Sequence, residues 1–166
     1  MKRLVMILTA VIVLVPVSLW AEDAPKAEVF GGFSLLSFGG GGDRTTAAGW
    51  QGALSGNVNE KFSIVGDFGG HYKDGASSLE YLGGPRYTHR VDKAALFVHA
   101  LYGGTHFSDG GGNHFTMAYG GGVDVNAGKN MAIRIVQFDW ALFKADSTWQ
   151  KDNVRFGFGV VFKMPK

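Results

Sequence analysis

Three side chains of the types used in nucleophilic catalysis recur along one short stretch of the chain. Ser63, Asp67 and His71 stand four residues apart, so on an extended strand they would share one face. Neighbouring members would then lie about 13 Å apart, because a strand rises about 3.3 Å per residue. A relay of nucleophile, base and orienting acid needs hydrogen-bond distances. We therefore predict no catalytic residues here, unless such groups converge from adjacent strands.

Two histidines could take part in metal binding. His106 and His114 flank one predicted connection and could approach each other. A metal site needs three or four ligands in fixed geometry, and no third ligand is evident, so we predict no metal site.

Gly39–Asp43 invites comparison with a phosphate-binding loop, but no Lys-Ser or Lys-Thr follows and no helical pattern begins there. We expect a surface loop at this run and no cofactor. The absence of cysteine excludes a disulfide scaffold, a thiolate metal site and a cysteine nucleophile.

The elements that carry these residues are predicted to be strands. Bulky residues alternate with small or polar ones along most of the chain, with a period of two. Between Phe62 and Tyr72, bulky side chains share one face, and Ser63, Asp67 and His71 lie on the other. About eight such segments, each of ten or so residues, are separated by clusters of Gly, Asn, Asp and Lys. Other clear examples are residues 50–58, 114–124 and 155–163.

Two segments depart from simple alternation. Pro85 lies inside Ser78–His89, and a closed sheet has no free edge for a proline, so we expect a local bulge there. Farther along, Arg134 and Asp139 have opposite parity within one predicted strand. A bulge near Val136 would return both charges to the small and polar face. The bulky face of that strand would then hold Ile133, Ile135, Phe138 and Trp140.

Glycine decides which face points outward. Six glycines fall on the small and polar face: Gly69, Gly103, Gly120, Gly122, Gly157 and Gly159. A solvent-facing surface has no need for so much glycine, which weakens strands, whereas a narrow barrel lumen needs small residues. We therefore predict a membrane barrel, in which bulky residues face lipid and polar residues face the lumen.

Charged residues fit this inverted polarity. Six belong to the predicted lumen face: Asp67, Glu80, Arg86, Arg134, Asp139 and Arg155. An Arg or Lys that faced lipid at the bilayer midplane would cost roughly 2–4 kcal/mol. Inside the barrel, the same residues can pair with opposite charges and fill the lumen.

The N-terminus has the pattern of an export signal. Lys2 and Arg3 precede an almost unbroken apolar run, which ends near Ala21, a small residue suited to cleavage. The alternative is an uncleaved membrane anchor, but the run is shorter than the roughly 20 residues that a spanning helix needs. We predict a signal peptide at residues 1–21 and one barrel domain at residues 22–166. Without the signal, the 16 basic residues become 14 and equal the 14 acidic ones, so no basic surface for nucleic acid is expected.

The predicted connections alternate in length. The longer ones are Gly39–Ala48, Lys73–Ser78, Ser108–Asn113 and Lys144–Asn153. The tight ones between them are Asn59–Lys61, Arg90–Lys93 and Ala127–Asn130. Such asymmetry is typical of a barrel with one end outside the cell and the other in the periplasm, and it places both termini in the periplasm. We expect any partner to bind the long loops, which include an exposed Trp149.

Taken together, the chain resembles the eight-stranded outer-membrane β-barrel proteins of Gram-negative bacteria, the OmpA-like and OmpX-like barrels of the porin family. The resemblance spans residues 27–162 and rests on Gly49–Lys61, Val65–Tyr72, Gly83–Arg86, Gly120–Asp124 and Ile133–Trp140. In the last predicted strand, four residues fit the spacing of the family's assembly signal: Arg155, Gly157, Val160 and Phe162. The family usually ends at the aromatic residue, whereas here Lys163 to Lys166 follow.

The resemblance implies an all-β, eight-stranded, antiparallel, up-and-down transmembrane barrel in the cell outer membrane. A barrel of eight strands holds side chains in its interior, not a wide channel. We therefore expect a monomeric structural or surface-interaction scaffold that is not an enzyme. Its partners would be outer-membrane lipid and an unidentified molecule at the outer loops, with no nucleic acid. The alternatives are a soluble exported barrel that binds an apolar ligand, a lipid acyl-chain enzyme, or a small-solute pore.

Overall fold

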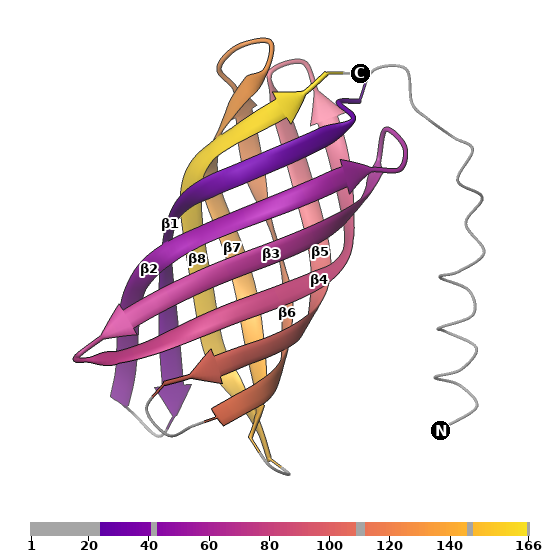
Figure 1. Cartoon of the computed structure of the whole chain (residues 1–166). Helices are drawn as coiled ribbons and strands as arrows, with labels where there is room; N and C mark the ends of the chain where they lie inside the picture. The colour runs from indigo at the N-terminus through magenta and orange to yellow at the C-terminus, as the bar shows by residue number, and fades with distance from the viewer. Residues whose placement is uncertain (1–23, 41–42, 109–111, 146–147, 166) are drawn as a thin grey trace, which may run out of the picture.

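Eight strands form a closed barrel in the computed structural model, which describes residues 24–40, 43–108, 112–145 and 148–165. The strands are β1 (Ala27–Gly40), β2 (Asp43–Asn57), β3 (Phe62–Lys73), β4 (Ala76–Val91), β5 (Ala94–Phe107), β6 (Gly112–Asn126), β7 (Met131–Ala145) and β8 (Thr148–Met164). Neighbours in sequence pair antiparallel, and β1 also pairs with β8 (Figure 1). The predicted eight-stranded up-and-down barrel is confirmed. The predicted signal peptide lies outside the described residues.

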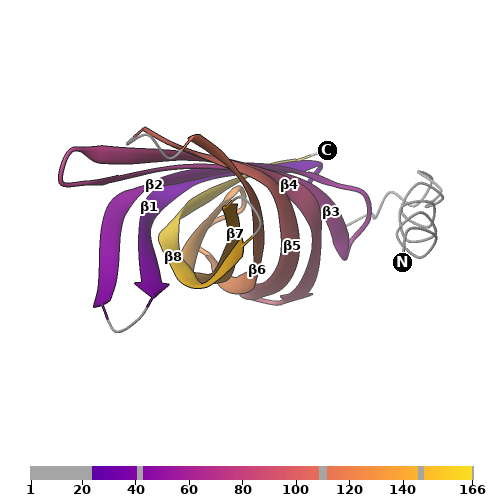
Figure 2. The same ribbon diagram turned by 90° about the horizontal axis from the view of Figure 1, so that it is seen from below.

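The two ends of the barrel are distinguished by where β1 begins and β8 ends. Ala27 of β1 pairs with Met164 of β8, so both strands reach the same end, here called the terminal end. The opposite end, here called the distal end, carries the β1–β2, β3–β4, β5–β6 and β7–β8 hairpins. Figure 2 views the ring of strands from the distal end. Within the described part of the chain, no helix is long and apolar enough to cross a membrane.

The distal hairpins are much shorter than the sequence predicted. β1 and β2 remain paired as far as Gly40 and Asp43, so most of Gly39–Ala48 is strand. Likewise, β7 and β8 pair as far as Ala145 and Thr148, which places most of the predicted Lys144–Asn153 loop in strands. The prediction of long distal connections is therefore wrong, whereas the connections at the terminal end, residues 58–61, 92–93 and 127–130, are short as predicted. Glycine and polar residues continue these strands because the neighbouring strand supplies their backbone hydrogen bonds.

The β3–β4 connection illustrates how tight these turns are. Lys73 pairs with Ala76, which leaves a turn of Asp74 and Gly75. Both turn residues have positive φ, 49° and 84°. Asp-Gly is a favoured sequence for a two-residue turn of this kind, because glycine adopts positive φ without steric cost. The predicted medium loop at Lys73–Ser78 is thus a minimal hairpin.

Side-chain directions follow the predicted polarity. The outward face carries large hydrophobic residues, whose exposed fractions include 55% for Phe158 and 59% for Val98. The inward face is buried and holds all six predicted lumen charges, Asp67, Glu80, Arg86, Arg134, Asp139 and Arg155. Because the apolar groups are outside and the charges inside, this surface is suited to hydrocarbon and not to water.

One of the two expected bulges is present and the other is absent. In β7, Ile135 and Val136 both point outward, and the register against β8 shifts between Arg134 and Gln137. This confirms the bulge predicted near Val136. At Pro85 the register is unbroken against β3, and the bulge predicted there is wrong. The ladder between β4 and β5 instead omits the pairs at positions 84 and 85, which accommodates a residue without an N–H.

Glycines on both faces make room for larger neighbours. Inside, a methyl group on Gly122 would lie 2.7 Å from the ring of Phe97, and one on Gly157 would lie 2.6 Å from Gln51. Outside, the Trp50 ring covers Gly70, where an added methyl group would lie 2.5 Å from its Nε1. The inward glycines therefore clear space for lumen side chains, as the sequence predicted.

Candidate functional site

The centre of the lumen is organised around Arg155, which projects from β8 and is fully buried. Its Nη1 donates to Asp67 Oδ1 at 2.8 Å and also to Glu80, and its Nη2 donates to Asp139 Oδ2 at 2.6 Å. The three carboxylates come from β3, β4 and β7, so one guanidinium crosslinks four strands through the lumen. All three acids are at most 1% exposed. We call these four residues the central cluster.

Polar side chains surround the central cluster and extend it. Gln51 donates to Asp67 at 2.6 Å. His99 and Gln137 both donate to Asp139, each at 2.7 Å. The Gln137 side chain then accepts from Arg134 at 2.6 Å, and Arg134 forms a two-point contact with Asp124 at 2.8 and 3.1 Å. A continuous hydrogen-bonded network therefore joins seven strands of the wall, β2 to β8.

A second network lies toward the terminal end. Arg86 of β4 pairs with Glu28 of β1 and donates to Ser55 at 3.0 Å and to Ser63 at 3.2 Å. Arg90 donates to the other Glu28 oxygen at 3.1 Å. We call these five residues the terminal cluster. Here two cations pair with one carboxylate, whereas in the central cluster one cation pairs with three carboxylates.

Apolar residues occupy the lumen between and beyond these clusters. One buried group contains Phe30, Ala53, Val65, Leu82, Leu101, Ala118, Ala132 and Val161. Phe97 connects the two networks, because Arg134 lies 4.3 Å and Arg86 lies 5.4 Å from its ring centroid. At the distal end, Leu36, Ala141 and Phe143 form another buried group, against which Phe38 and Phe107 pack. Side chains therefore fill the lumen from one end toward the other.

The structure separates the three residues considered for catalysis. Ser63 accepts from Arg86, and Asp67 accepts from Arg155 and Gln51. His71 instead lies 2.9 Å from Ser34 Oγ through its Nε2. The role of Ser34 was not predicted, because no short-range signal in the sequence links positions 37 residues apart.

The Ser34–His71 contact resembles a nucleophile and its base. Ser34 is wholly buried, however, and His71 Nδ1 has no hydrogen-bond partner among the described residues. A catalytic relay would have an orienting acid at that nitrogen. The described residues therefore do not assemble a Ser-His-acid relay at this point.

The two histidines considered for metal binding also have other partners. His106 Nδ1 is 2.9 Å from Asn113 Oδ1, and His114 Nδ1 is 3.2 Å from the carbonyl oxygen of Lys144. No group of three or more potential metal ligands occurs in the part of the chain that the structure describes. Trp149, expected to be exposed in a loop, lies in β8 and is half-buried, with its ring 6.2 Å from that of Phe115.

The residues of the suggested assembly signal lie along β8. Arg155 and Gly157 face the lumen, whereas Phe162 faces outward and is 56% exposed. Val160 lies on the outward parity and is half-buried. The alternation required by the spacing is present, while recognition by an assembly factor stays a prediction.

Comparison with solved structures places this architecture among known barrels. Neisserial surface protein A matches with a TM-score of 0.71 at 12% identity, over 86% of this chain and 100% of its own. The chain has the fold of the eight-stranded outer-membrane β-barrels. The N-terminal barrel of Pseudomonas aeruginosa OprF matches with a TM-score of 0.59 at 13% identity, over 84% of this chain and 98% of its own.

A third similar structure is Ail, the attachment invasion locus protein of Yersinia pestis. It has a TM-score of 0.57 at 15% identity, over 85% of this chain and 99% of its own. No family model matches the chain, and no curated protein matches it in sequence. The resemblance inferred from the sequence is thus confirmed at the level of the fold, and these low identities carry no residue roles.

Proposed function

We propose that the protein is exported to the outer membrane and acts there as a structural and surface-interaction scaffold with a closed lumen. The observation that carries this proposal is the central cluster. Four buried charged side chains from four strands meet in the middle of the barrel, and polar partners tie them to further strands. A solute that passed through would have to break these charge-assisted hydrogen bonds, which are among the stronger ones in proteins.

The outward surface supports the membrane location. Large apolar side chains face outward from every strand, and charged side chains in the middle of the wall face inward. A soluble carrier of apolar ligands would need the reverse arrangement, with bulky residues lining an internal cavity. In our proposal the terminal end lies in the periplasm and the distal end at the cell surface.

Conductance separates a scaffold from a pore. The purified protein would be reconstituted into planar bilayers, and its conductance would be compared with that of a 16-stranded porin. We expect no stable open state at low voltage, because packed side chains fill an eight-stranded lumen. A steady conductance from the native protein would contradict the closed-lumen proposal.

Fractionation tests the location independently. Envelope fractions would be separated, and gel mobility would be compared with and without boiling. We expect the protein in the outer membrane and a different mobility when unheated, because a folded barrel resists detergent. Recovery in the aqueous periplasmic fraction would instead support the soluble ligand-binding alternative.

A further inference from the structure

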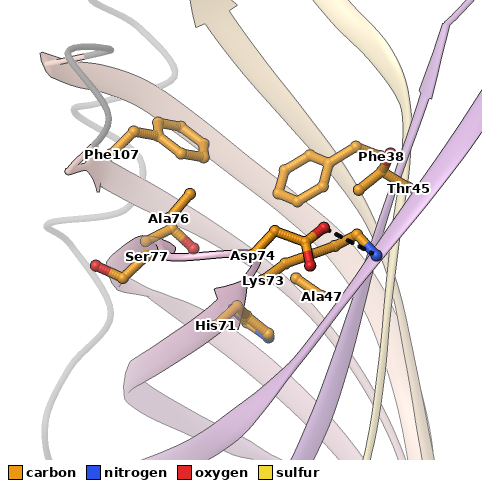
Figure 3. Close-up of a pocket in the computed structure, with 10 residues that line it drawn as sticks. Phe38, Thr45, Ala47, His71, Lys73, Asp74, Ala76, Ser77 and Phe107 are labelled. Carbon is orange, nitrogen blue, oxygen red and sulfur yellow. Dashed lines mark ion pairs between the residues drawn. The ribbon is translucent and has the colours of Figure 1, made fainter.

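A cavity of 340 Å³ opens at the distal end, apart from the central and terminal clusters. Figure 3 shows Phe38 and Phe107 on one side of it and Lys73, Asp74 and His71 on the other. The two phenyl rings lie 6.1 Å apart between centroids. The volume falls within the roughly 300–1,000 Å³ that is common for small-molecule sites.

The phenyl wall favours an aromatic ligand. Phe38 and Phe107 are both half-buried, and Phe143 contacts both rings from within the lumen, at 5.9 and 5.8 Å between centroids. Their positions are therefore fixed by packing behind them. An aromatic ring placed against such a wall gains more than an aliphatic group of equal area.

His71 lies at the floor of the cavity, where its imidazole can report on an occupant. The described residues give Ser34 Oγ one side-chain partner, His71 Nε2 at 2.9 Å. His71 Nδ1 is buried without a partner. Because this nitrogen has almost no accessible surface, an occupant of the cavity does not bond to it, and the ring serves as a reporter of occupancy.

A cation stands at the rim. Lys73 Nζ is 3.7 Å from Asp74 Oδ2, and the two side chains are 42% and 87% exposed. A pair this exposed contributes little stability. Lys73 can therefore turn toward a second carboxylate, although Asp74 also adds negative charge near the opening.

We propose that this distal cavity binds small aromatic carboxylates. The aromatic ring would pack against Phe38 and Phe107, and the carboxylate would pair with Lys73 at the rim, next to His71. The assignment of the opening to the cell surface rests on the proposed function. Binding itself does not, because both ends of the barrel are accessible in a lipid nanodisc.

Histidine signals provide a direct test with 1-naphthoate as the probe. The full chain, labelled at histidine with ¹³C and ¹⁵N, would be placed in nanodiscs and titrated while the imidazole resonances are recorded. We expect a saturable shift of the His71 signals. Naphthalene-1-methanol and cyclohexanecarboxylate should bind more weakly, because each lacks one of the two recognised groups.

Two variants assign the roles of the rim and the wall. Lys73→Gln should weaken 1-naphthoate about two- to fivefold, as expected for an exposed ion pair, and leave naphthalene-1-methanol unchanged. Phe107→Leu should weaken 1-naphthoate about two- to tenfold and leave cyclohexanecarboxylate unchanged. Lys151→Gln is the matched control, because Lys151 is exposed and does not line the cavity.

The proposal would be overturned by unsaturable or absent shifts at His71 in the native protein. Equal weakening by Lys73→Gln and Lys151→Gln would also overturn it, because this would indicate general charge attraction. Each variant would first be checked for heat-modifiable gel mobility. For a variant that fails this check, the comparison of the three probes on the native protein decides the result.

Discussion

Replacing Arg155 with methionine would remove the cation of the central cluster and keep a side chain of similar length. Asp67 would retain its bond from Gln51, and Asp139 would retain those from His99 and Gln137. Removing one partner of a buried ion pair costs about 3–5 kcal/mol. Since three carboxylates lose their cation together, we expect a loss near the upper part of that range.

Glu80 provides the sharper part of this experiment. One of its oxygens contacts Arg155 and the other has no partner among the described residues. In the Arg155→Met background, Glu80→Gln should therefore recover stability by removing a buried, uncompensated charge. Glu60→Gln is the matched control, because Glu60 is exposed.

The assay would be urea unfolding in lipid vesicles, followed by tryptophan fluorescence and by gel mobility without heating. Lys93→Met, at an exposed turn position, controls for the loss of a positive charge. The reasoning fails if Arg155→Met unfolds at the same urea concentration as Lys93→Met. It also fails if Glu80→Gln recovers no more stability than Glu60→Gln.

Four further changes test other parts of the barrel. Arg86→Leu leaves Glu28 with Arg90 as its one cation among the described residues, and it should lower the free energy of unfolding by about 3 kcal/mol. An unchanged urea midpoint would argue against the pairing. Phe158→Arg, on the outward face, should cost roughly 2–4 kcal/mol in vesicles, whereas a soluble barrel would tolerate it. Deleting Val136 removes the bulge and restores alternation, so it should still give a heat-modifiable barrel. The control is deletion of Ala118 from β6, which has no bulge. This deletion exchanges the lipid and lumen faces of the rest of the strand and should abolish folding.

The fold was predictable because a barrel in lipid imposes a repetitive rule on its sequence. Every second side chain meets hydrocarbon, so parity alone assigned the faces of β3 and located the bulge at Val136. The rule carries no information on where pairing stops. Gly39 and Trp149 were assigned to loops from composition, whereas the strands continue through both. At Pro85 the sequence predicts a bulge, whereas the β4–β5 ladder accommodates the proline by omitting two residue pairs.

The lumen contacts were only partly predictable, because they depend on register between distant strands. The six charges were assigned correctly to the interior, since charge in lipid is costly. Nothing in the local sequence showed that Arg155 would be shared by three acids. Likewise, Ser34 and His71 meet because β1, β2 and β3 pair in one particular register.

The tight distal turns have a consequence for molecular recognition. Asp74–Gly75 leaves the β3–β4 hairpin almost no backbone beyond its last paired residues. An antibody against this tip would meet a shape held by the sheet, so a linear peptide of the same residues should compete poorly. Raising such a reagent would call for the folded protein as immunogen, and its epitope should vanish when the sample is boiled.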